Sequence, residues 1–337
     1  MNKTSALFGG LGLLVCLALP ALGAPKLTVA GAEDGERPSF PILTTAEFRA
    51  AAEAWTPLFE AQCGCALAVT VADDALALLP ALRGNAAEVV VGLPLSALEE
   101  ARASDRFAPH GQAAPAAVPA AWSDELFLPV AYGWLGFVYD TTRLTAAPVS
   151  FPEIAKAGPN ALRIAVDDPR ASSAGLDAVA WMRATHKDAA AAMWAGAAPK
   201  LVIARSRGDA LAKLEAGEVD LALAATTWPA LKSSEGKMRF RLTPFREGQF
   251  LQIESAAIVK GAKHPDIAAQ FLAFLVAPEA QAAVAARRGL YPVHPAAQVP
   301  DAFGNLTLPS WSITLDAREW AAKKGEWLAE FERAVAR

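Results

Sequence analysis

A long apolar and aromatic run, residues 126–140 (LFLPVAYGWLGFVYD), exceeds the usual length of a β-strand and contains Pro129, Gly133 and Gly136. Such a strand can pass from one domain into another, and an ordinary core strand is the alternative interpretation. Residues 250–260 (FLQIESAAIVK) alternate like a strand and would make the return crossing. With 337 residues, 53% of them hydrophobic, the chain is long enough for two cores. We therefore expect two domains joined by two crossing strands.

Strand and helix patterns alternate in both halves of the chain. Apolar spacing predicts a helix from Glu47, a strand at 67–71, a helix at 75–83 and a strand at 88–92. Helices also separate a second set of predicted strands, at 164–166, 200–204 and 219–224. This alternation predicts an α/β fold with a mostly parallel, doubly wound sheet. Ligands in such folds bind at the carboxyl ends of strands and between lobes.

The N-terminal residues follow the pattern of an export signal. Lys3 precedes an apolar run at 6–19, and the small residues that follow predict cleavage after Gly23. The predicted mature chain begins with a short strand at 27–29 and continues as a loop rich in Gly, Pro and charge at 30–41. The protein is therefore predicted to act outside the cytoplasm.

Charge and cysteine content narrow the classes of partner. The chain carries 31 basic and 35 acidic residues, a formal net charge of −4, which argues against a nucleic-acid partner. Cys63 and Cys65 remain after export, and an oxidising compartment predicts a local disulfide between them. A metal would need two further ligands, and the four histidines are scattered without ligand-like spacing. No metal site is predicted.

Residues 164–182 combine a short apolar run, a Pro-containing turn and a helical pattern, with Ser172 and Ser173 at the predicted start of the helix. Backbone N–H groups are unpaired there, and their partial positive charge suits an anionic group of a ligand. Capping of the helix by one serine is the alternative interpretation. The segment is therefore a candidate anion-binding site.

Candidates for acid–base chemistry are few. Asp73 and Asp74 follow a predicted strand, and Glu254 lies on the predicted return strand. The sequence contains no Gly-x-Ser-x-Gly nucleophile elbow and no phosphate-binding Gly-x4-Gly-Lys-Ser/Thr loop. Binding without catalysis is therefore favoured, and an enzyme that uses Asp73 or Asp74 as a base is the alternative from a different class.

Six short motifs occur along the chain in a fixed order: 59–65 (FEAQCGC), 132–140 (YGWLGFVYD), 168–175 (DPRASSAG), 226–229 (TTWP), 247–252 (EGQFLQ) and 291–293 (YPV). In this order they resemble the periplasmic thiamine-binding proteins of ABC importers. The resemblance implies an α/β, two-lobe periplasmic-binding-protein (type 2) fold with two hinge crossings and a central ligand cleft. The implied organisation is a signal peptide at 1–23, lobe 1 at 24–128 plus 253–295, and lobe 2 at 129–252 plus 296–337.

The same resemblance implies a function in transport. The protein would be a monomeric periplasmic subunit that captures thiamine, thiamine monophosphate or thiamine diphosphate and delivers it to a permease and its ATPase. It would need no cofactor and catalyse no reaction. Another phosphorylated or carboxylated small molecule is the alternative ligand.

The resemblance also assigns roles to individual residues. Asp74 would meet the cationic or aminopyrimidine end of thiamine, and Ser172 and Ser173 would hold the hydroxyethyl or phosphate end. Thr226 and Thr227 would contribute hydroxyl or backbone groups.

Some matching positions carry different residue types in this chain. Where the family has aromatic residues, this chain has Arg207, Ala225, Gly289 and the segment 30–32. Ala75 stands where the family has glycine, while Trp228 and Trp134 would supply rings from another direction. Arg207 would repel a thiazolium and attract a phosphate or carboxylate. The predicted ligand-binding set is Asp74, Ala75, Ser172, Ser173, Arg207, Ala225, Thr226, Thr227 and Trp228.

Overall fold

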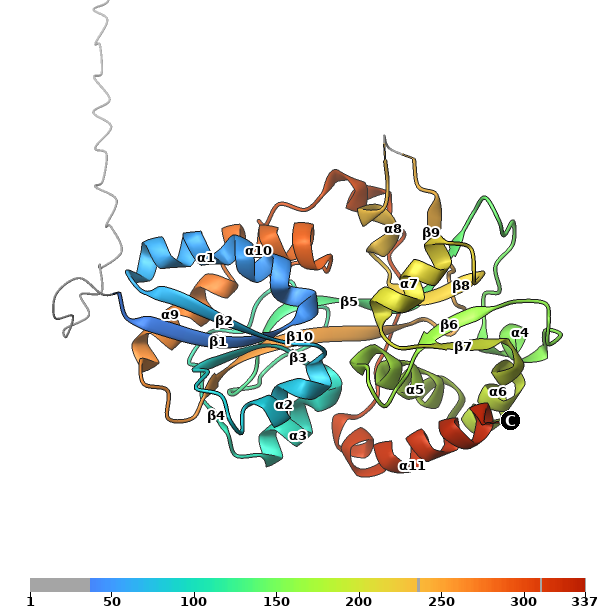
Figure 1. Ribbon diagram of the computed structural model, residues 1–337, viewed down its shortest axis with the longest axis horizontal. Coiled ribbons are helices and arrows are strands. Elements are labelled where there is room, and N and C mark those ends of the chain that lie inside the picture. The colour runs from blue at the N-terminus through green and yellow to red at the C-terminus, as the bar shows by residue number, and fades with distance from the viewer. Residues whose placement is uncertain (1–36, 235–236, 310, 337) are drawn as a thin grey trace, which may run out of the picture. The chain divides into compact units, whose positions relative to one another are not determined.

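The computed structural model describes residues 37–234, 237–309 and 311–336. The predicted signal peptide, the predicted strand at 27–29 and residues 30–36 of the predicted loop lie outside these ranges. Within the described residues, eleven strands form one sheet with helices on both of its faces (Figure 1).

The first element group is built on three parallel strands. Its members are β1 (Ser39–Thr45), β2 (Ala66–Ala72), β3 (Val89–Pro94), α1 (Arg49–Cys63), α2 (Leu78–Ala81), α3 (Leu98–Ala103), α9 (Pro265–Leu275), α10 (Pro278–Ala283) and the 3-10 turns η1 (Ala46–Phe48) and η2 (Ala75–Ala77). β1 lies between β2 and β3 and pairs with both in parallel. Trp55 and Phe59 of α1 and Phe271 of α9 are fully buried in the same core. Apolar burial on this scale stabilises the group by about 2 kcal/mol for each large side chain.

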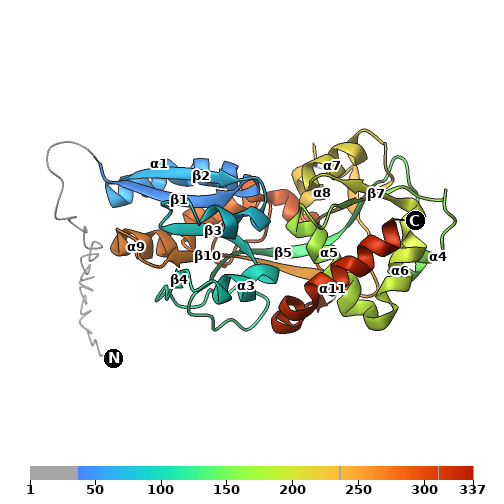
Figure 2. The same ribbon diagram turned by 60° about the horizontal axis from the view of Figure 1, so that its bottom comes forward.

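The second element group repeats this arrangement. Its members are α4 (Phe151–Lys156), β6 (Ile164–Asp167), α5 (Ser173–His186), α6 (Ala190–Ala197), β7 (Leu201–Ala204), α7 (Arg207–Glu215), β8 (Leu221–Ala225), α8 (Trp228–Leu231) and α11 (Ala317–Val335). β6 lies between β7 and β8, parallel to both. Trp181 of α5 is fully buried, and its ring centroid lies 4.7 to 5.9 Å from those of Phe137, Phe151 and Phe245. Helix α11 packs against α5 and α6 (Figure 2).

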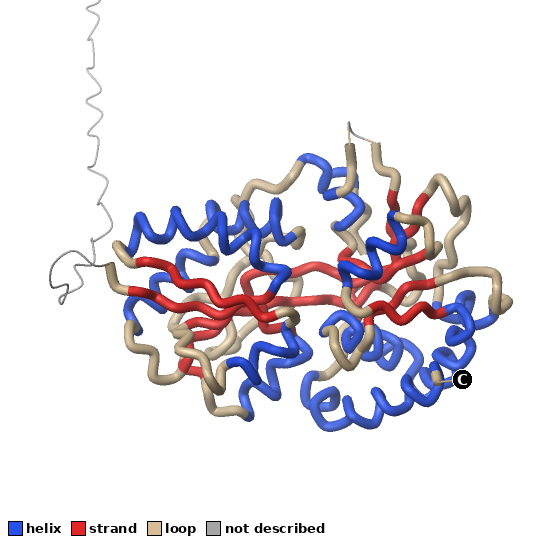
Figure 3. The backbone as a smooth tube through the Cα atoms, in the orientation of Figure 1, coloured by secondary structure: helices blue, strands red, loops and turns tan. Residues whose placement is uncertain are grey.

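Two long strands, β5 (Leu128–Asp140) and β10 (Gln249–Val259), join the two element groups (Figure 3). β10 pairs antiparallel with β3 and β5, and β5 pairs antiparallel with β8. Three shorter strands pair alongside: β4 (Phe107–Ala108), β9 (Phe240–Leu242) and β11 (Ser312–Ile313). The order of the main strands is β2-β1-β3-β10-β5-β8-β6-β7. Both predicted crossings are confirmed, but the sheet is mixed because the crossing strands run antiparallel to β3, β8 and each other.

The sequence prediction is wrong for the start of β1. The predicted loop at 30–41 overlaps this strand, which begins at Ser39. Phe40 and Ile42 are fully buried, and the whole strand pairs with β2. This distant pairing outweighs a local composition that is typical of loops. The lobe boundaries at 128/129 and 252/253 fall at the start of β5 and inside β10, and the division of the chain into those lobes remains a prediction.

Cys63 ends α1 and forms a disulfide with Cys65, so the predicted bond is confirmed. Gly64 between them has φ of 66°, a left-handed conformation that glycine adopts without steric cost. Among the described residues, no single helix is long and apolar enough to cross a membrane. Pro265–Leu275 and Pro278–Arg288 satisfy length and composition together as a pair bent by 61°, and their apolar residues belong to the buried core of the first element group.

Candidate functional site

Strand β10 presents two different faces where it passes between the element groups. On one face, the Gln252 side-chain amide donates to Asp177 of α5 over 2.7 Å, and Glu254 accepts a hydrogen bond from Arg288 over 3.0 Å. Leu251 and Ile253 point to the opposite face, where they pack with aromatic residues. The polar face of β10 therefore lines the candidate site.

Asp74 joins the first element group to the second. It follows β2, where its carboxylate accepts from the Leu76 N–H over 2.9 Å and so caps η2. The same carboxylate accepts from the backbone N–H of Ser173, the first residue of α5, over 3.0 Å. Burial raises the pKa of Asp74, although both hydrogen bonds oppose that shift. Ala75, the next residue, is buried, whereas Asp73 is exposed.

Ser172 precedes Ser173, the residue that contacts Asp74, but its own side chain points to Asp167. Its hydroxyl donates to the Asp167 carboxylate over 3.0 Å, and it makes no side-chain cap to α5. Gly175 permits this close approach, because a Cβ there would lie 2.6 Å from the carbonyl oxygen of Asp167. Burial raises the pKa of Asp167 to about 6, in spite of the Ser172 hydrogen bond and nearby Arg207. The hydroxyl of Ser172 thus supports a buried carboxyl group rather than the end of the helix.

Two arginines compensate two glutamates at the centre of the site. Arg288 contacts both Glu254 and Glu47, and its Nη2 lies 2.9 Å from the Glu47 carboxylate. Arg207, the first residue of α7, has its Nη1 3.2 Å from the other oxygen of Glu47. Burial would raise the pKa of Glu47, but the two arginines lower it below its usual value. Burial raises the pKa of Glu254 despite its contact with Arg288.

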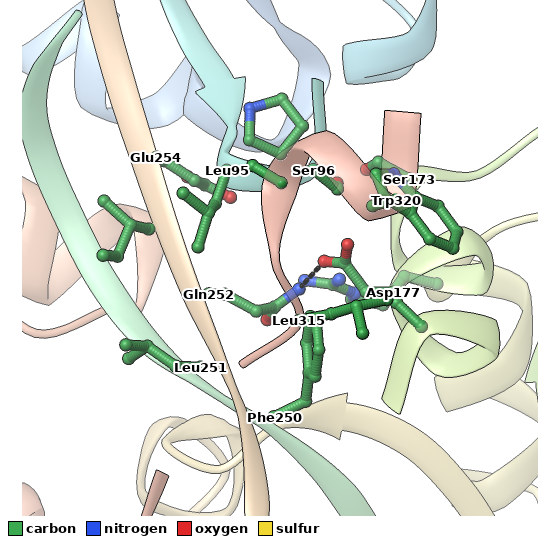
Figure 4. Close-up of a pocket in the computed structure, with 15 residues that line it drawn as sticks. Leu95, Ser96, Ser173, Asp177, Phe250, Leu251, Gln252, Glu254, Leu315 and Trp320 are labelled. Carbon is green, nitrogen blue, oxygen red and sulfur yellow. Dashed lines mark hydrogen bonds between the residues drawn. The ribbon is translucent and has the colours of Figure 1, made fainter. Parts of the chain in front are cut away.

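A cavity of about 20 Å³ lies between α5, β10 and the start of α11. Figure 4 shows Asp177 and Gln252 meeting beside it, and Ser173 and Trp320 also line it. Burial raises the pKa of Asp177 to about 6, although the Gln252 hydrogen bond favours the charged form. Gln252 Oε1 and Trp320 Nε1 are buried and have no hydrogen-bond partner within the described ranges. Arg207 lines the same cavity.

The remaining predicted residues lie elsewhere. Ala225 is buried in the hydrophobic core, and the Thr227 hydroxyl donates to the Gly289 carbonyl. Thr226 borders a separate groove of about 820 Å³ together with Arg241 and Trp311. Of the predicted residues, Ser173 and Arg207 therefore line the cavity, and Asp74 contacts Ser173. Ala75 and Ser172 are their chain neighbours and do not line it, and neither do Ala225, Thr226, Thr227 and Trp228.

Trp228 and Trp134, which were considered as ligand contacts, both interact with other side chains of the protein. The ring of Trp228 lies 4.9 Å from that of Phe240, measured between centroids. Trp134 donates through its indole nitrogen to the Ser312 hydroxyl over 2.8 Å. Its ring also packs against Tyr132 and Tyr291 on the opposite face of β10 from Gln252.

Five charged or polar residues of the site were not predicted from sequence: Glu47, Asp167, Asp177, Gln252 and Arg288. Glu47 follows β1 just as Asp74 follows β2, and a correctly placed first strand would have identified it. Asp177 and Gln252 are far apart in sequence, so no local pattern connects them.

A family model described as bacterial extracellular solute-binding protein matches residues 59–307. The thiamine-binding periplasmic protein of Escherichia coli (strain K12) is 35% identical over 310 residues, which cover 88% of this chain and 94% of that relative. The protein of the same name from Brucella melitensis biotype 1 (strain ATCC 23456 / CCUG 17765 / NCTC 10094 / 16M) is 32% identical over 288 residues, covering 83% and 86%.

Solved structures of other proteins are also similar to this chain. A periplasmic thiamin binding protein superimposes with a TM-score of 0.84 at 33% identity and covers 89% of this chain and 97% of its own. A ferric binding protein from Campylobacter jejuni reaches a TM-score of 0.72 at 18% identity, covering 88% and 99%, which shows a shared fold alone. The two-lobe periplasmic-binding-protein (type 2) fold implied by the sequence motifs is confirmed.

Proposed function

We propose that this chain, which belongs to the family of bacterial extracellular solute-binding proteins, is the periplasmic solute-binding subunit of an ABC importer for thiamine or its phosphate esters. The match to thiamine-binding periplasmic proteins along most of both chains carries this proposal. The subunit would act as a monomer, catalyse no reaction and deliver its ligand to a permease with an ATPase.

The charges of the site support a cationic ligand. Carboxyl groups outnumber guanidinium groups in the site. The carboxyl groups are those of Glu47, Asp74, Asp177 and Glu254, and the guanidinium groups are those of Arg207 and Arg288. Such an excess of carboxyl groups favours a cation, and the thiazolium of thiamine carries one positive charge. Asp74, between the two element groups, is the carboxylate we assign to that end of the ligand.

The size of the cavity supports a site that must open. Ligand sites for small molecules usually enclose roughly 300–1,000 Å³, whereas the cavity beside Ser173 has about 20 Å³. We infer that lobe 1 (24–128 plus 253–295) and lobe 2 (129–252 plus 296–337) separate through β5 and β10 to admit the ligand. Ser172 and Ser173 then meet it from lobe 2.

The test is a calorimetric titration of the mature protein with thiamine, thiamine monophosphate and thiamine diphosphate, repeated by tryptophan fluorescence. Saturable one-to-one binding of at least one compound is the expected result, and chromatography should return the ligand unchanged. Lack of binding to all three would contradict thiamine as the ligand. Chemical conversion of the ligand would instead favour an enzyme that uses Asp74.

A second ligand class is favoured by one observation. Arg207 lines the cavity, and its guanidinium would hold a phosphate or carboxylate on a ligand without a thiazolium. Phosphorylated and carboxylated metabolites are therefore the next compounds to titrate.

A further inference from the structure

Arg207 is the charged residue of the site on which a further inference about the ligand rests. It is the first residue of α7, and it lines the same cavity as Ser173, the first residue of α5. Arg207 of α7 therefore reaches the cavity beside which α5 begins. The guanidinium of Arg207 adds a full positive charge to the partial charge of the α5 start.

The charge of Arg207 is poorly satisfied compared with that of Arg288. Arg288 makes hydrogen bonds to both Glu254 and Glu47. Arg207 reaches only an ion-pair distance of 3.2 Å to Glu47. Its Nε and Nη1 are buried without a hydrogen-bond partner among the residues that the structure describes. Glu47 is thus shared by two arginines, and Arg207 has donors to spare.

The cavity also offers acceptors. Gln252 is 8% exposed, and its Oε1 is buried without a partner in the described part of the chain. Asp177 lies beside it. A ligand that fits this lining must accept hydrogen bonds at Arg207 and donate them, or carry positive charge, near the carboxyl groups.

We propose that Arg207 determines which form of the ligand this protein selects, favouring phosphate esters of thiamine over thiamine itself. This inference rests on the proposed function and adds to it the preferred form. The charge of Arg207 acts on Asp74, the carboxylate assigned to the thiazolium, so Arg207 repels a thiazolium that binds there without a phosphate. A phosphate would give Arg207 a charge-assisted partner of its own, because Arg207 otherwise shares Glu47 with Arg288.

The test compares the unaltered protein with Arg207→Gln. The unaltered protein should bind thiamine monophosphate about tenfold or more tightly than thiamine, the size expected for one charge-assisted hydrogen bond. In Arg207→Gln that ratio should fall by about tenfold, because ester binding weakens and thiamine binding strengthens. Calorimetry of both ligands at fixed ionic strength measures the ratio.

Arg205→Gln is the matched control. Arg205 lies two residues away, its side chain is 89% exposed, and it pairs with Asp209 rather than with the site. Its loss removes the same charge and should leave the ratio unchanged. An equal ratio in the unaltered protein and Arg207→Gln would overturn the inference while the proposed function stands.

Inorganic diphosphate provides a readout that does not depend on thiamine. Millimolar diphosphate should raise the melting temperature of the unaltered protein and of Arg205→Gln, but not of Arg207→Gln. If no thiamine compound binds, the proposed function fails, and this comparison still decides the role of Arg207. An equal shift in all three proteins, or none in any, would then contradict anion selection by Arg207.

Discussion

Asp177 is a carboxyl group that folding moves into surroundings where its charge is unfavourable. It is 3% exposed, and burial raises its pKa to about 6 from 3.8. Between those values the folded chain holds a proton that the unfolded chain has lost, so the free energy of unfolding falls as pH rises. Above pH 6 the full penalty is present, on the order of 1–3 kcal/mol.

Asp177→Asn removes this titration and keeps an oxygen that can accept from Gln252. We expect the variant to be more stable than the unaltered protein at pH 7.5, by about 1–3 kcal/mol, and no more stable at pH 4. Urea unfolding at the two pH values measures the difference. Asp188→Asn is the control because the Asp188 side chain is fully exposed. A gain of equal size at both pH values would contradict the assignment.

Asp74 allows a second prediction for a single residue, because this predicted ligand residue makes a direct contact across the site. Asp74→Ala should weaken ligand binding by about 1.5–3 kcal/mol, the contribution of a charge-assisted contact. Asp73→Ala, at the exposed neighbouring position, should bind as the unaltered protein does. The measurement is the titration with thiamine and its esters, and unchanged affinity in Asp74→Ala would remove this residue from the site.

At the scale of elements, the position of the start of α5 depends on the absence of a side chain at Gly175. A Cβ on Gly175 would lie 2.6 to 2.7 Å from backbone atoms of Asp167 and Pro169. Backbone atoms cannot turn aside as a flexible side chain can. Any residue larger than glycine must therefore push the helix away from β6, and Ser172 and Ser173 would move with it.

Gly175→Ala should destabilise the protein by about 1–3 kcal/mol, a typical cost of forcing an extra group into a packed site. Gly208→Ala is its counterpart at the start of α7, where the nearest atom is 3.8 Å from the added Cβ. This control should fold as stably as the unaltered chain, since alanine favours helices. Equal stability of the two variants, measured by urea unfolding, would show that the close approach at Gly175 relaxes freely.

The elements also show what the sequence can predict. β5 and β10 were predicted because their apolar runs are long and local. β1 was misplaced because its start lies in a Gly- and Pro-rich stretch, and its strand conformation depends on distant pairing with β2. In the site, the hydroxyl and carboxyl residues that follow strands were predicted at Asp74, Ser172 and Ser173. Contacts such as Asp177 with Gln252 depend on tertiary structure alone.

At the scale of the whole described chain, several polar contacts join the two element groups, and two of them lie at the site. Asp74 bonds to Ser173, and Glu47 pairs with Arg207. Each joins a residue of the first element group to one of the second. Polar contacts of this kind contribute about 1 kcal/mol each, which is enough to shift a balance between open and closed states by several-fold.

The double variant Asp74→Ala/Arg207→Gln should therefore have a larger radius of gyration than the unaltered protein when no ligand is added. Small-angle X-ray scattering measures this quantity in solution. Asp73→Ala/Arg205→Gln changes the same charges at exposed positions and should scatter as the unaltered protein does. Identical scattering from both double variants and the unaltered protein would show that these contacts do not control closure.

The two faces of β10 have a consequence for how this protein can diversify. Gln252 and Glu254 point to the site, while Leu251 and Ile253 pack with Trp134 on the other side. Because alternate residues face opposite ways, substitutions at the first pair alter the site without entering the aromatic cluster. A single inserted residue would exchange the two linings at once. Ligand preference can thus evolve, or be redesigned, by point substitution on this strand but not by changing its length.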